Sequence, residues 1–551
     1  MKGTFVAVSN VYAAALPPQV GHAVVTTESG PRVDRTTRNE PSWRRWLIAS
    51  VAAGALQISP ALAQNFGQWS GTILFPNIPV SAAVLPTGTL LTWSSYQPFS
   101  FELDIGNAAS QTYTSLYDPA TGAIMPGVEN SMMADMFCSG LAYLADGRLM
   151  VNGGSNSMHT AIYDPIADTW TSDAMMNIAR GYNSTVTLST GEAFTIGGSW
   201  AGDGSPKDGE VWSNAGWRQT SISENNILAY DPIDTAQGYI SEGDDHPWLF
   251  AAPNGRVFHA GPSPLMNWID TRGSGSITAA GNRADDPHSI NGVAVMYAPG
   301  RIFKTGGQPS YTNADATTNS YVIDINASIA NPAAPVNVRA VAPMAYPRAY
   351  ANGVVLPGGK VLIIGGETHG ITFNDDTSVM TPELWDPATE QFTLLAPMDT
   401  PRNYHSVALL LPDGRVFSGG GGLCDEGCLV NHPDGAIFSP PYLFAADGVT
   451  PASRPAFVAD PSGTVPLGSA LSVSTSGPVR SFELIRLSAT THTINTDQRR
   501  VPLTIASAAA NAYSLTIPAE PGIVVPGYWM LFALDANGTP SVAKIIKLVQ
   551  P

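Results

Sequence analysis

Tyr404 and His405 are adjacent in the chain and have the clearest potential for metal chemistry in this sequence. A phenolate oxygen and an imidazole nitrogen are both ligands for a borderline transition metal. Neighbouring side chains of a regular strand point to opposite faces, so both could reach one ion only where the chain bends. A Tyr-His pair is also compatible with ordinary packing, and a functional interpretation needs further groups that converge on it.

A short motif recurs from residue 64 onward and supplies a frame for this pair. Each copy has a turn glycine, three to five apolar residues and then small residues, often Gly-Gly. The seven copies begin at Gly88, Gly147, Gly191, Gly255, Gly300, Gly359 and Gly414. A period of about fifty residues predicts kelch-type blades, in which glycines let inner strands crowd around an axis. We therefore predict that residues 64–445 form a seven-bladed kelch-type β-propeller.

Three candidate sites occupy one equivalent place in the predicted blades. Cys138, Tyr182 and the Tyr404-His405 pair each lie about nine to ten residues ahead of a repeat glycine. In a closed ring, equivalent positions lie at the same end and near the axis. We therefore expect these side chains to converge.

The last hundred residues follow a different pattern. Residues 446–551 lack Gly-Gly and contain short alternating strands, which predicts an immunoglobulin-like β-sandwich. Residues 491–500, which include His492, are polar and charged for a sandwich core. We expect them to form a loop or hairpin that reaches outward.

Composition agrees with an all-β protein and excludes one class of partner. Only 13% of the 551 residues are charged, and the chain contains 53 Gly and 45 Pro, which favours many turns. The formal charge of −17 argues against nucleic acid as a partner.

The first 63 residues resemble an export leader. Arg44 and Arg45 precede a short apolar run, and residues 61–63 read Ala-Leu-Ala, a small-x-small cleavage pattern. We predict cleavage after Ala63 and a secreted or periplasmic protein, exported by the general or the twin-arginine route. An uncleaved membrane anchor is the alternative, although Pro60 interrupts the apolar run. We expect no membrane association after cleavage.

Export makes the three cysteines informative. Cys424 and Cys428 lie in a Gly-rich loop, and in an oxidising compartment we expect them to form a disulfide. A metal–thiolate pair is the alternative. Cys138 is then left over, as an inert buried thiol or as a functional group.

Five motifs, in this order, resemble those of the copper radical oxidases, the family of galactose oxidase and glyoxal oxidase. They are Asp135-Met136-Phe137-Cys138, Arg180-Gly181-Tyr182, Ile196-Gly197-Gly198-Ser199-Trp200, Tyr404-His405-Ser406 and the stretch from Thr491 to Arg500. The similarity runs from about Trp69 to the C-terminus. We expect the chain to lack a carbohydrate-binding domain like that at the N-terminus of galactose oxidase.

The resemblance implies a site and an activity. Tyr182, Tyr404, His405 and His492 would ligate one copper ion, and Cys138 would be joined to Tyr182 by a thioether bond, with Trp200 stacked over both. Two phenolates and two imidazoles also suit Cu(II) in tetragonal geometry. Tyr404 would take the alcohol proton, and Tyr182 would take the hydrogen from the carbon. The predicted function is a secreted mononuclear copper radical oxidase that converts a primary alcohol or an aldehyde with O2 and releases H2O2. We expect it to act as a monomer.

The same resemblance predicts how the substrate pocket differs from that of galactose oxidase. There an arginine and a glutamine hold the sugar hydroxyls, beside a tyrosine and a phenylalanine. Here Glu242 stands for the arginine and Thr312 for the glutamine, while Tyr311 and Phe373 keep the aromatic positions and His246 lies close by in the sequence. Replacing a guanidinium by a carboxylate removes donors and reverses the charge. We expect galactose and anions such as glyoxylate to be disfavoured, and neutral or cationic primary alcohols or small aldehydes to be preferred.

Two other functions are compatible with a propeller. One is a non-catalytic kelch propeller that binds a glycan or a protein. The other is a hydrolase with paired carboxylates in the channel, for which the candidates are Glu242, Asp244, Asp245 and Glu367. No spacing pairs these acids, so we interpret them as a solvated loop or a calcium site.

Overall fold

The structure is a computed structural model that describes residues 65–551 apart from 102–110, 203–204, 229–243, 460 and 462. These described residues belong to one compact unit, Leu62–Pro551. The predicted leader and Glu242 lie outside the described residues.

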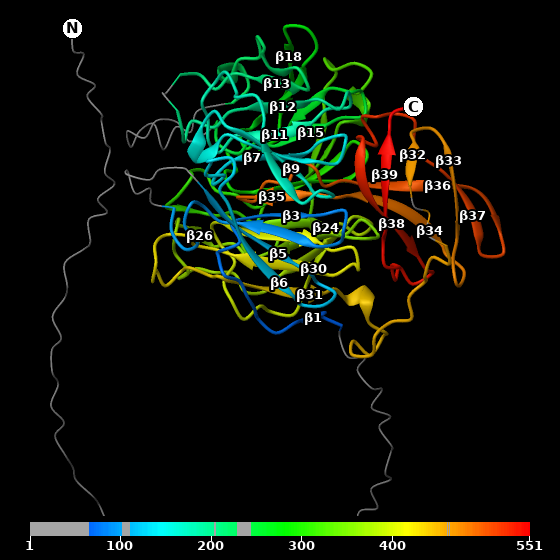
Figure 1. Cartoon of the computed structure of the whole chain (residues 1–551). Coiled ribbons are helices and arrows are strands. Elements are labelled where there is room, and N and C mark those ends of the chain that lie inside the picture. Colours follow the sequence, from blue (N-terminus) through cyan, green and yellow to red (C-terminus); the bar gives the residue numbers. More distant parts are fainter. Residues whose placement is uncertain (1–64, 102–110, 203–204, 229–243, 460, 462) are drawn as a thin grey trace, which may run out of the picture. The chain divides into compact units, whose positions relative to one another are not determined.

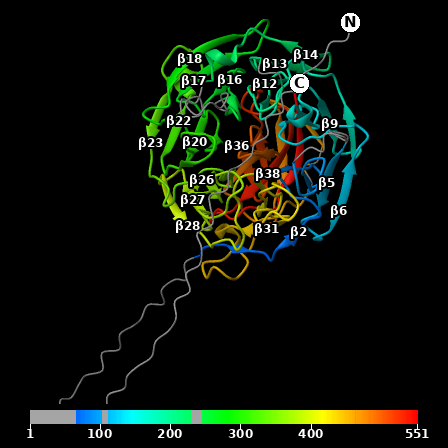
Figure 2. The ribbon, with the colours of Figure 1, turned by 90° about the vertical axis from the view of Figure 1, so that its left-hand side faces the viewer.

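Seven antiparallel sheets form the blades, and each has four main strands. The inner strands are β3 (Ser81–Val84), β7 (Gly140–Tyr143), β11 (Ser184–Thr187), β15 (Leu249–Ala251), β19 (Val293–Ala298), β24 (Asn352–Val355) and β29 (Ser406–Leu410). The second strands are β4 (Leu90–Trp93), β8 (Leu149–Asn152), β12 (Ala193–Ile196), β16 (Val257–His259), β20 (Arg301–Thr305), β25 (Val361–Ile364) and β30 (Val416–Gly420). Figure 2 shows the blades following one another around a ring.

The outer half of each blade is more exposed. The third strands are β5 (Thr112–Tyr117), β9 (Thr160–Asp164), β13 (Glu210–Ser213), β17 (Leu265–Asp270), β22 (Ser320–Asp324), β27 (Glu383–Asp386) and β31 (Asp434–Ser439). The outermost strands are β6 (Ile124–Glu129), β10 (Thr169–Ser172), β14 (Gly216–Gln219), β18 (Ser276–Asn282), β23 (Asn337–Ala340), β28 (Gln391–Leu394) and, in blade 7, β1 (Gln68–Trp69). Because β1 pairs with β31, the start of the described chain closes the ring.

Short elements complete the connections. The small sheet of β21 (Ala314–Asp315) and β26 (His369–Gly370) links the loops of blades 5 and 6, and β2 (Ile73–Leu74) pairs with β31. In the described part of the chain the helices are single 3₁₀ turns: η1 (Gly154–Asn156), η2 (Glu224–Asn226), η4 (Asn326–Ser328) and η5 (Pro441–Leu443). None of these described helices is long and apolar enough to cross a membrane.

Burial explains why the repeat motif has no strict alternation. Strands such as β25 are buried at every residue because neighbouring blades cover both faces, whereas β28 is mostly exposed. The repeat motif forms the second strand of each blade, so the prediction that its glycines serve the crowding of inner strands is wrong. Gly365 and Gly366 follow β25 at φ 71° and 89°, and a Cβ on Gly365 would lie 2.0 Å from the Arg402 carbonyl oxygen. The glycines are needed where one blade meets the segment that enters the next.

The C-terminal domain is a β-sandwich. Its strands are β32 (Thr464–Pro466), β33 (Ala470–Ser474), β34 (Ser481–Arg486), β36 (Arg500–Ala509), β37 (Ala512–Thr516), β38 (Gly527–Leu534) and β39 (Lys544–Val549). The long strand β36 pairs with β34 at its start and with β37 at its end, and so joins the two sheets. Phe482, Trp529 and Leu531 lie in the core between them. The predicted all-β fold of seven blades and a C-terminal sandwich is confirmed.

One strand leaves this domain. β35 (Ala489–Thr491) pairs with the inner strand β3 of blade 1 (Figure 1), which makes that blade five-stranded. The residues that follow run among the inner strands of other blades: Thr496 donates to the Thr185 carbonyl, Gln498 to that of Gly353 and Arg499 to that of Ala251. The polar stretch leaves the sandwich, as expected, and it is buried inside the propeller, where it supplies polar groups to backbone that the blades leave unpaired.

Candidate metal centre

Cys138, Tyr182 and His405 share a backbone conformation that is uncommon outside glycine. Their φ angles are 61°, 66° and 69°, and each residue lies one or two positions before an inner strand. The bend at His405 brings its ring against that of Tyr404, with ring centroids 3.8 Å apart. The bend that a shared metal requires is therefore present.

Buried arginines hold two of these bends in place. Arg180 donates to the Gly197 carbonyl and to Glu210, each at 3.0 Å, and its side chain is fully buried. Arg402 makes the corresponding bonds to the Gly420 carbonyl and to Asp434 in blade 7. Charge-assisted bonds of this kind fix the segment that enters the inner strand.

The predicted ligands converge at the propeller axis. The hydroxyl oxygens of Tyr182 and Tyr404 are 2.5 Å apart. Cys138 Sγ and one nitrogen each of His405 and His492 lie within 4.8 Å of one another, and all three residues are buried. His492 Nε2 is 3.6 Å from Cys138 Sγ. These groups come from blades 2, 3 and 7 and from the C-terminal domain, and they lie together in the fold.

Hydrogen bonds orient both imidazoles. His405 Nδ1 lies 2.5 Å from the Gly422 carbonyl oxygen, which can only accept, so Nδ1 carries the proton. The Thr491 hydroxyl donates to the Val80 carbonyl and therefore accepts from His492 Nδ1, which is 2.7 Å away. Each ring is thereby left with an unprotonated Nε2. His405 Nε2 is buried and has no hydrogen-bond partner among the described residues.

The electrostatics of the site favour neutral ligands. Burial lowers the pKa of His405 to about 3 and that of His492 well below its ordinary value, so both imidazoles stay neutral. Burial also raises the pKa of Tyr182 and of Tyr404 well above the usual range. A bound cation would reverse this effect for the tyrosines, because it stabilises the phenolate form. Two phenol oxygens and two imidazole nitrogens fit Cu(II).

Comparison with known proteins identifies the family of this chain. Residues 454–548 match the family described as Galactose oxidase-like, Early set domain, and residues 300–425 match that described as Glyoxal oxidase N-terminus. The chain is 41% identical over 524 residues to galactose oxidase of Gibberella zeae. The aligned residues cover 94% of this chain and 75% of that protein. The chain belongs to the copper radical oxidase family.

Two further relatives widen the range of activities. An aldehyde oxidase of Arabidopsis thaliana is 25% identical over 481 residues, which cover 79% of this chain and 75% of that protein. The solved structure of a fungal alcohol oxidase of the AA5 family in complex with copper has a TM-score of 0.82 and 40% identity, and covers 88% of this chain and 100% of that one. The protein is thus a copper-dependent oxidase of alcohols or aldehydes that uses O2, which excludes the binding-module and hydrolase alternatives.

Aromatic rings surround Tyr182 of this copper radical oxidase. Trp200 stacks on Tyr182 with ring centroids 4.9 Å apart and an interplanar angle of 12°. His246 is buried, and its ring lies 4.6 Å from that of Tyr182 and 4.8 Å from that of His492. Trp200 remains 39% exposed, so it separates the tyrosine from solvent. His246, assigned from sequence to the substrate pocket, lies against Tyr182 and His492.

The other predicted pocket residues lie on the Tyr404 side. The Tyr311 hydroxyl is 3.0 Å from that of Tyr404, and the Phe373 ring meets the Tyr404 ring edge-on at 5.3 Å. Thr312 is half-buried, and its hydroxyl accepts from the backbone N–H of Thr372, beside Phe373. The fifth predicted pocket residue, Glu242, lies outside the described residues.

Two residues of the site were missed in the sequence. Phe101 stacks on Phe373 with centroids 5.6 Å apart at 8°, and no motif marks it. Tyr350 packs edge-on against Tyr404 at 5.2 Å. The sequence contains a signal for Tyr350, because Arg348-Ala349-Tyr350 repeats the pattern Arg180-Gly181-Tyr182.

Two of the acidic residues considered for hydrolysis accept hydrogen bonds from neighbouring residues of the fold. Asp244 accepts hydrogen bonds from the hydroxyl and N–H of Ser199, and Glu367 accepts from the N–H of Ile371. Both are buried, as is Asp245, so the interpretation of these three as a solvated loop is wrong. Within the described residues the metal-compatible cluster of His, Cys and acidic groups is the one at Cys138, His405 and His492.

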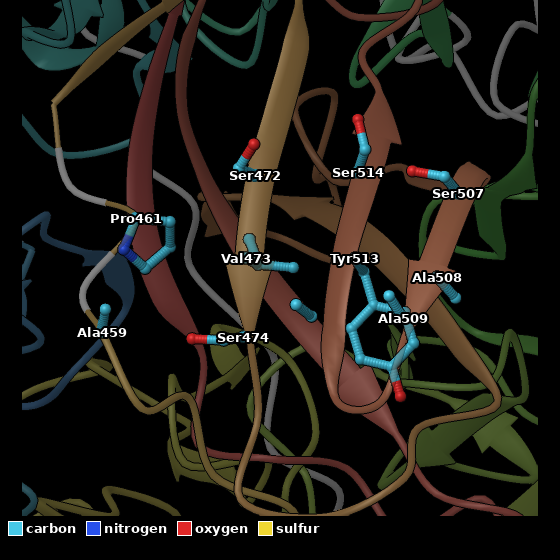
Figure 3. A pocket seen from close by; sticks show the side chains of 11 residues that line it. Ala459, Pro461, Ser472, Val473, Ser474, Ser507, Ala508, Ala509, Tyr513 and Ser514 are labelled. Atoms are coloured by element: carbon cyan, nitrogen blue, oxygen red, sulfur yellow. The ribbon is translucent and has the colours of Figure 1, made fainter.

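Cys424 and Cys428 form a disulfide, and Cys138 is buried and forms no disulfide. A separate groove of about 460 Å³ opens on the C-terminal domain over β33, β36 and β37. Figure 3 shows that it is lined by serine hydroxyls and small apolar side chains around Tyr513. The groove shares no residue with the cluster at Cys138, His405 and His492, and its described lining residues include no histidine or cysteine.

Proposed function

We propose that Tyr182, Tyr404, His405 and His492 bind the single copper ion of this oxidase. The observation that supports this most directly is the approach of the two phenol oxygens to 2.5 Å beside the unpartnered Nε2 of His405. An isolated pair of buried phenols would gain one hydrogen bond, whereas a metal bound beside them would also use the lone pair of the buried His405 Nε2.

Oxidation of a primary alcohol to an aldehyde removes two electrons and two protons, and O2 accepts them to give H2O2. Copper, when bound, supplies a one-electron redox centre and an electrophilic position for the alcohol oxygen. Tyr404 Oη takes the alcohol proton, and its hydrogen bond with Tyr311 Oη holds it in position. Tyr182, joined to Cys138 by a thioether and covered by Trp200, takes the hydrogen from the carbinol carbon. Trp200 excludes water from that ring.

The proposed substrates are neutral primary alcohols and small aldehydes, with apolar or aromatic groups favoured beside the reacting carbon. Support comes from the stacked rings of Phe101 and Phe373 next to Tyr404. Thr312 offers one short hydroxyl where galactose oxidase has a glutamine, so fewer hydrogen bonds reach the hydroxyls of a sugar.

The proposed domain boundaries and location follow from the same sequence features. We place the catalytic propeller at residues 64–445 and the sandwich at 446–551, with a cleaved leader before them. The disulfide supports an oxidising compartment. We propose a secreted or periplasmic monomer.

Two experiments test the proposal. His492→Ala should lose copper while the propeller still folds, because His492 lies outside the blades; copper content and thermal unfolding of purified protein measure this. His369→Ala, which removes a partly exposed imidazole, is the control and should retain copper. Full copper occupancy at unchanged affinity in His492→Ala would contradict the ligand set.

Peroxide release from a panel of galactose, glyoxylate, butanol and benzyl alcohol tests the substrate class. Benzyl alcohol and butanol should be oxidised faster than galactose or glyoxylate. Galactose turning over faster than every simple alcohol and aldehyde would overturn the assignment.

A further inference from the structure

A single residue of the loop after β30 contacts both Tyr404 and His405. The Gly422 carbonyl accepts from His405 Nδ1 at 2.5 Å, and the Gly422 N–H donates to the Tyr404 carbonyl at 3.0 Å. The peptide groups on either side of Gly422 therefore determine where the imidazole and its backbone lie.

Gly422 cannot hold this position by itself. Gly421 and Gly422 have φ angles of 124° and 84°, and a Cβ on Gly422 would lie 2.3 Å from the Val430 carbonyl oxygen. Glycine has the largest conformational freedom of any residue, so consecutive glycines need external ties to keep one carbonyl in place.

Asn431 provides these ties. Its Oδ1 accepts from the N–H groups of Leu423 at 2.7 Å and Cys424 at 3.0 Å. Its Nδ2 donates to the carbonyls of Phe99 at 2.9 Å and Asp425 at 2.5 Å. The Cys424–Cys428 disulfide closes the turn that these bonds surround. His432 N–H also donates to the Gly421 carbonyl, at 3.0 Å.

We propose that Asn431 and the Cys424–Cys428 disulfide position the copper ligand His405 by holding the Gly422 carbonyl against its Nδ1. The proposal rests on the proposed function, in which His405 Nε2 binds copper. A fixed acceptor at Nδ1 keeps the ring in one tautomer and one orientation, with the Nε2 lone pair directed at the metal. Loss of such a partner typically weakens metal binding by about 10- to 100-fold.

The test measures copper affinity of metal-free protein by competition with a chelator. Asn431→Ala and the double variant Cys424→Ser/Cys428→Ser should each bind Cu(II) about 10- to 100-fold more weakly than the wild type. The nitrogen couplings in the electron paramagnetic resonance spectrum of the Cu(II) form should also change, which a purely structural role would not cause.

Asn326→Ala is the matched control. Asn326 also ties a glycine turn through side chain–backbone bonds, to the Pro299 and Gly300 carbonyls, in blade 5. It should lower the unfolding temperature and leave copper affinity unchanged. Where Asn431→Ala does not fold, Asn431→Asp replaces it, since this variant keeps the acceptor and loses the two donated bonds, and a weaker affinity is again expected.

The outcomes separate this inference from the proposed function. A wild type that binds no Cu(II) contradicts the ligand set itself. A wild type that binds Cu(II), with folded Asn431 and cysteine variants of equal affinity and unchanged nitrogen couplings, overturns the positioning role alone.

Discussion

Blades 3 and 6 place a tyrosine at the same point of the fold, Tyr182 before β11 and Tyr350 before β24. The φ angles are 66° and 60°, and both tyrosines follow a buried arginine by two residues. Arg348 bonds the Gly365 carbonyl and Glu383 just as Arg180 bonds its own glycine carbonyl and glutamate. The backbone frame of the two blades is thus the same.

The residue between arginine and tyrosine differs. A Cβ on Gly181 would lie 2.7 Å from Trp200 Cε3 and 2.9 Å from Ala201 Cβ. Glycine at this position therefore leaves the space in which Trp200 stacks on Tyr182. In blade 6 the corresponding residue, Ala349, carries a Cβ; it bridges Glu367 antiparallel, whereas Gly181 bridges Ser199 parallel.

The hydroxyl groups also have different partners. Tyr182 Oη meets Tyr404 Oη, whereas Tyr350 Oη donates to the backbone carbonyl of Tyr311 at 2.5 Å. One repeated position thus places a hydroxyl against Tyr404 in blade 3 and supports the Tyr311 backbone in blade 6. The neighbours contributed by other blades decide the role.

Tyr182→Phe should give the largest effect. It removes a ligand and the group that takes hydrogen, so kcat should fall by about 10⁴-fold or more, as when one member of a catalytic unit is lost. Peroxide release and copper content measure the two losses. Activity within tenfold of the wild type would show that Tyr182 is not part of the reacting group.

Cys138→Ala removes a neighbour of Tyr182 that Tyr350 lacks. Copper binding should be largely intact, because Cys138 is not a ligand, while turnover falls on the order of 10³-fold, or about 4 kcal/mol of activation free energy. Intact-mass analysis should find the wild type two hydrogens lighter than its sequence after allowing for the disulfide. A free Cys138 thiol in fully active enzyme would contradict the thioether proposal.

Gly181→Ala makes blade 3 resemble blade 6. The added Cβ should push Trp200 from Tyr182 and lower kcat about 10- to 100-fold, the cost of a displacement near 1 Å at a reacting group, with copper affinity retained. Ala349→Gly is the reciprocal control and should leave kcat unchanged. Equal activity of Gly181→Ala and the wild type would mean that the stacked indole does not matter for turnover.

Tyr350→Phe should give the smallest effect. It removes the hydroxyl that donates to the Tyr311 carbonyl and that accepts from Gln308 Nε2 at 3.4 Å. The free energy of unfolding should therefore fall by about 1 kcal/mol, measured by denaturant titration. Copper affinity should stay unchanged and kcat should change only a few-fold. Loss of copper in this variant would show that blades 3 and 6 are functionally closer than their contacts indicate.

The sequence alone predicted the blades and the place of most residues proposed as copper ligands. The repeat is a local signal, since each glycine and each apolar run acts on its own turn and strand, and closure of the ring then brings equivalent positions together. Cys138, Tyr182 and His405 could be aligned for that reason, although the spacing did not distinguish His405 from Tyr404 as the kinked residue.

Only the tertiary structure shows which equivalent residues gather around Tyr404 and how His492 comes to lie beside them. Tyr182 and Tyr350 follow the same local pattern, and their roles depend on Trp200, Tyr404 and Tyr311, which come from other parts of the chain. The polar stretch of the sandwich domain is buried because its side chains satisfy inner-strand carbonyls at Thr185, Gly353 and Ala251. Unpaired backbone groups of this kind exist only once the blades have assembled, so no local sequence pattern predicts them.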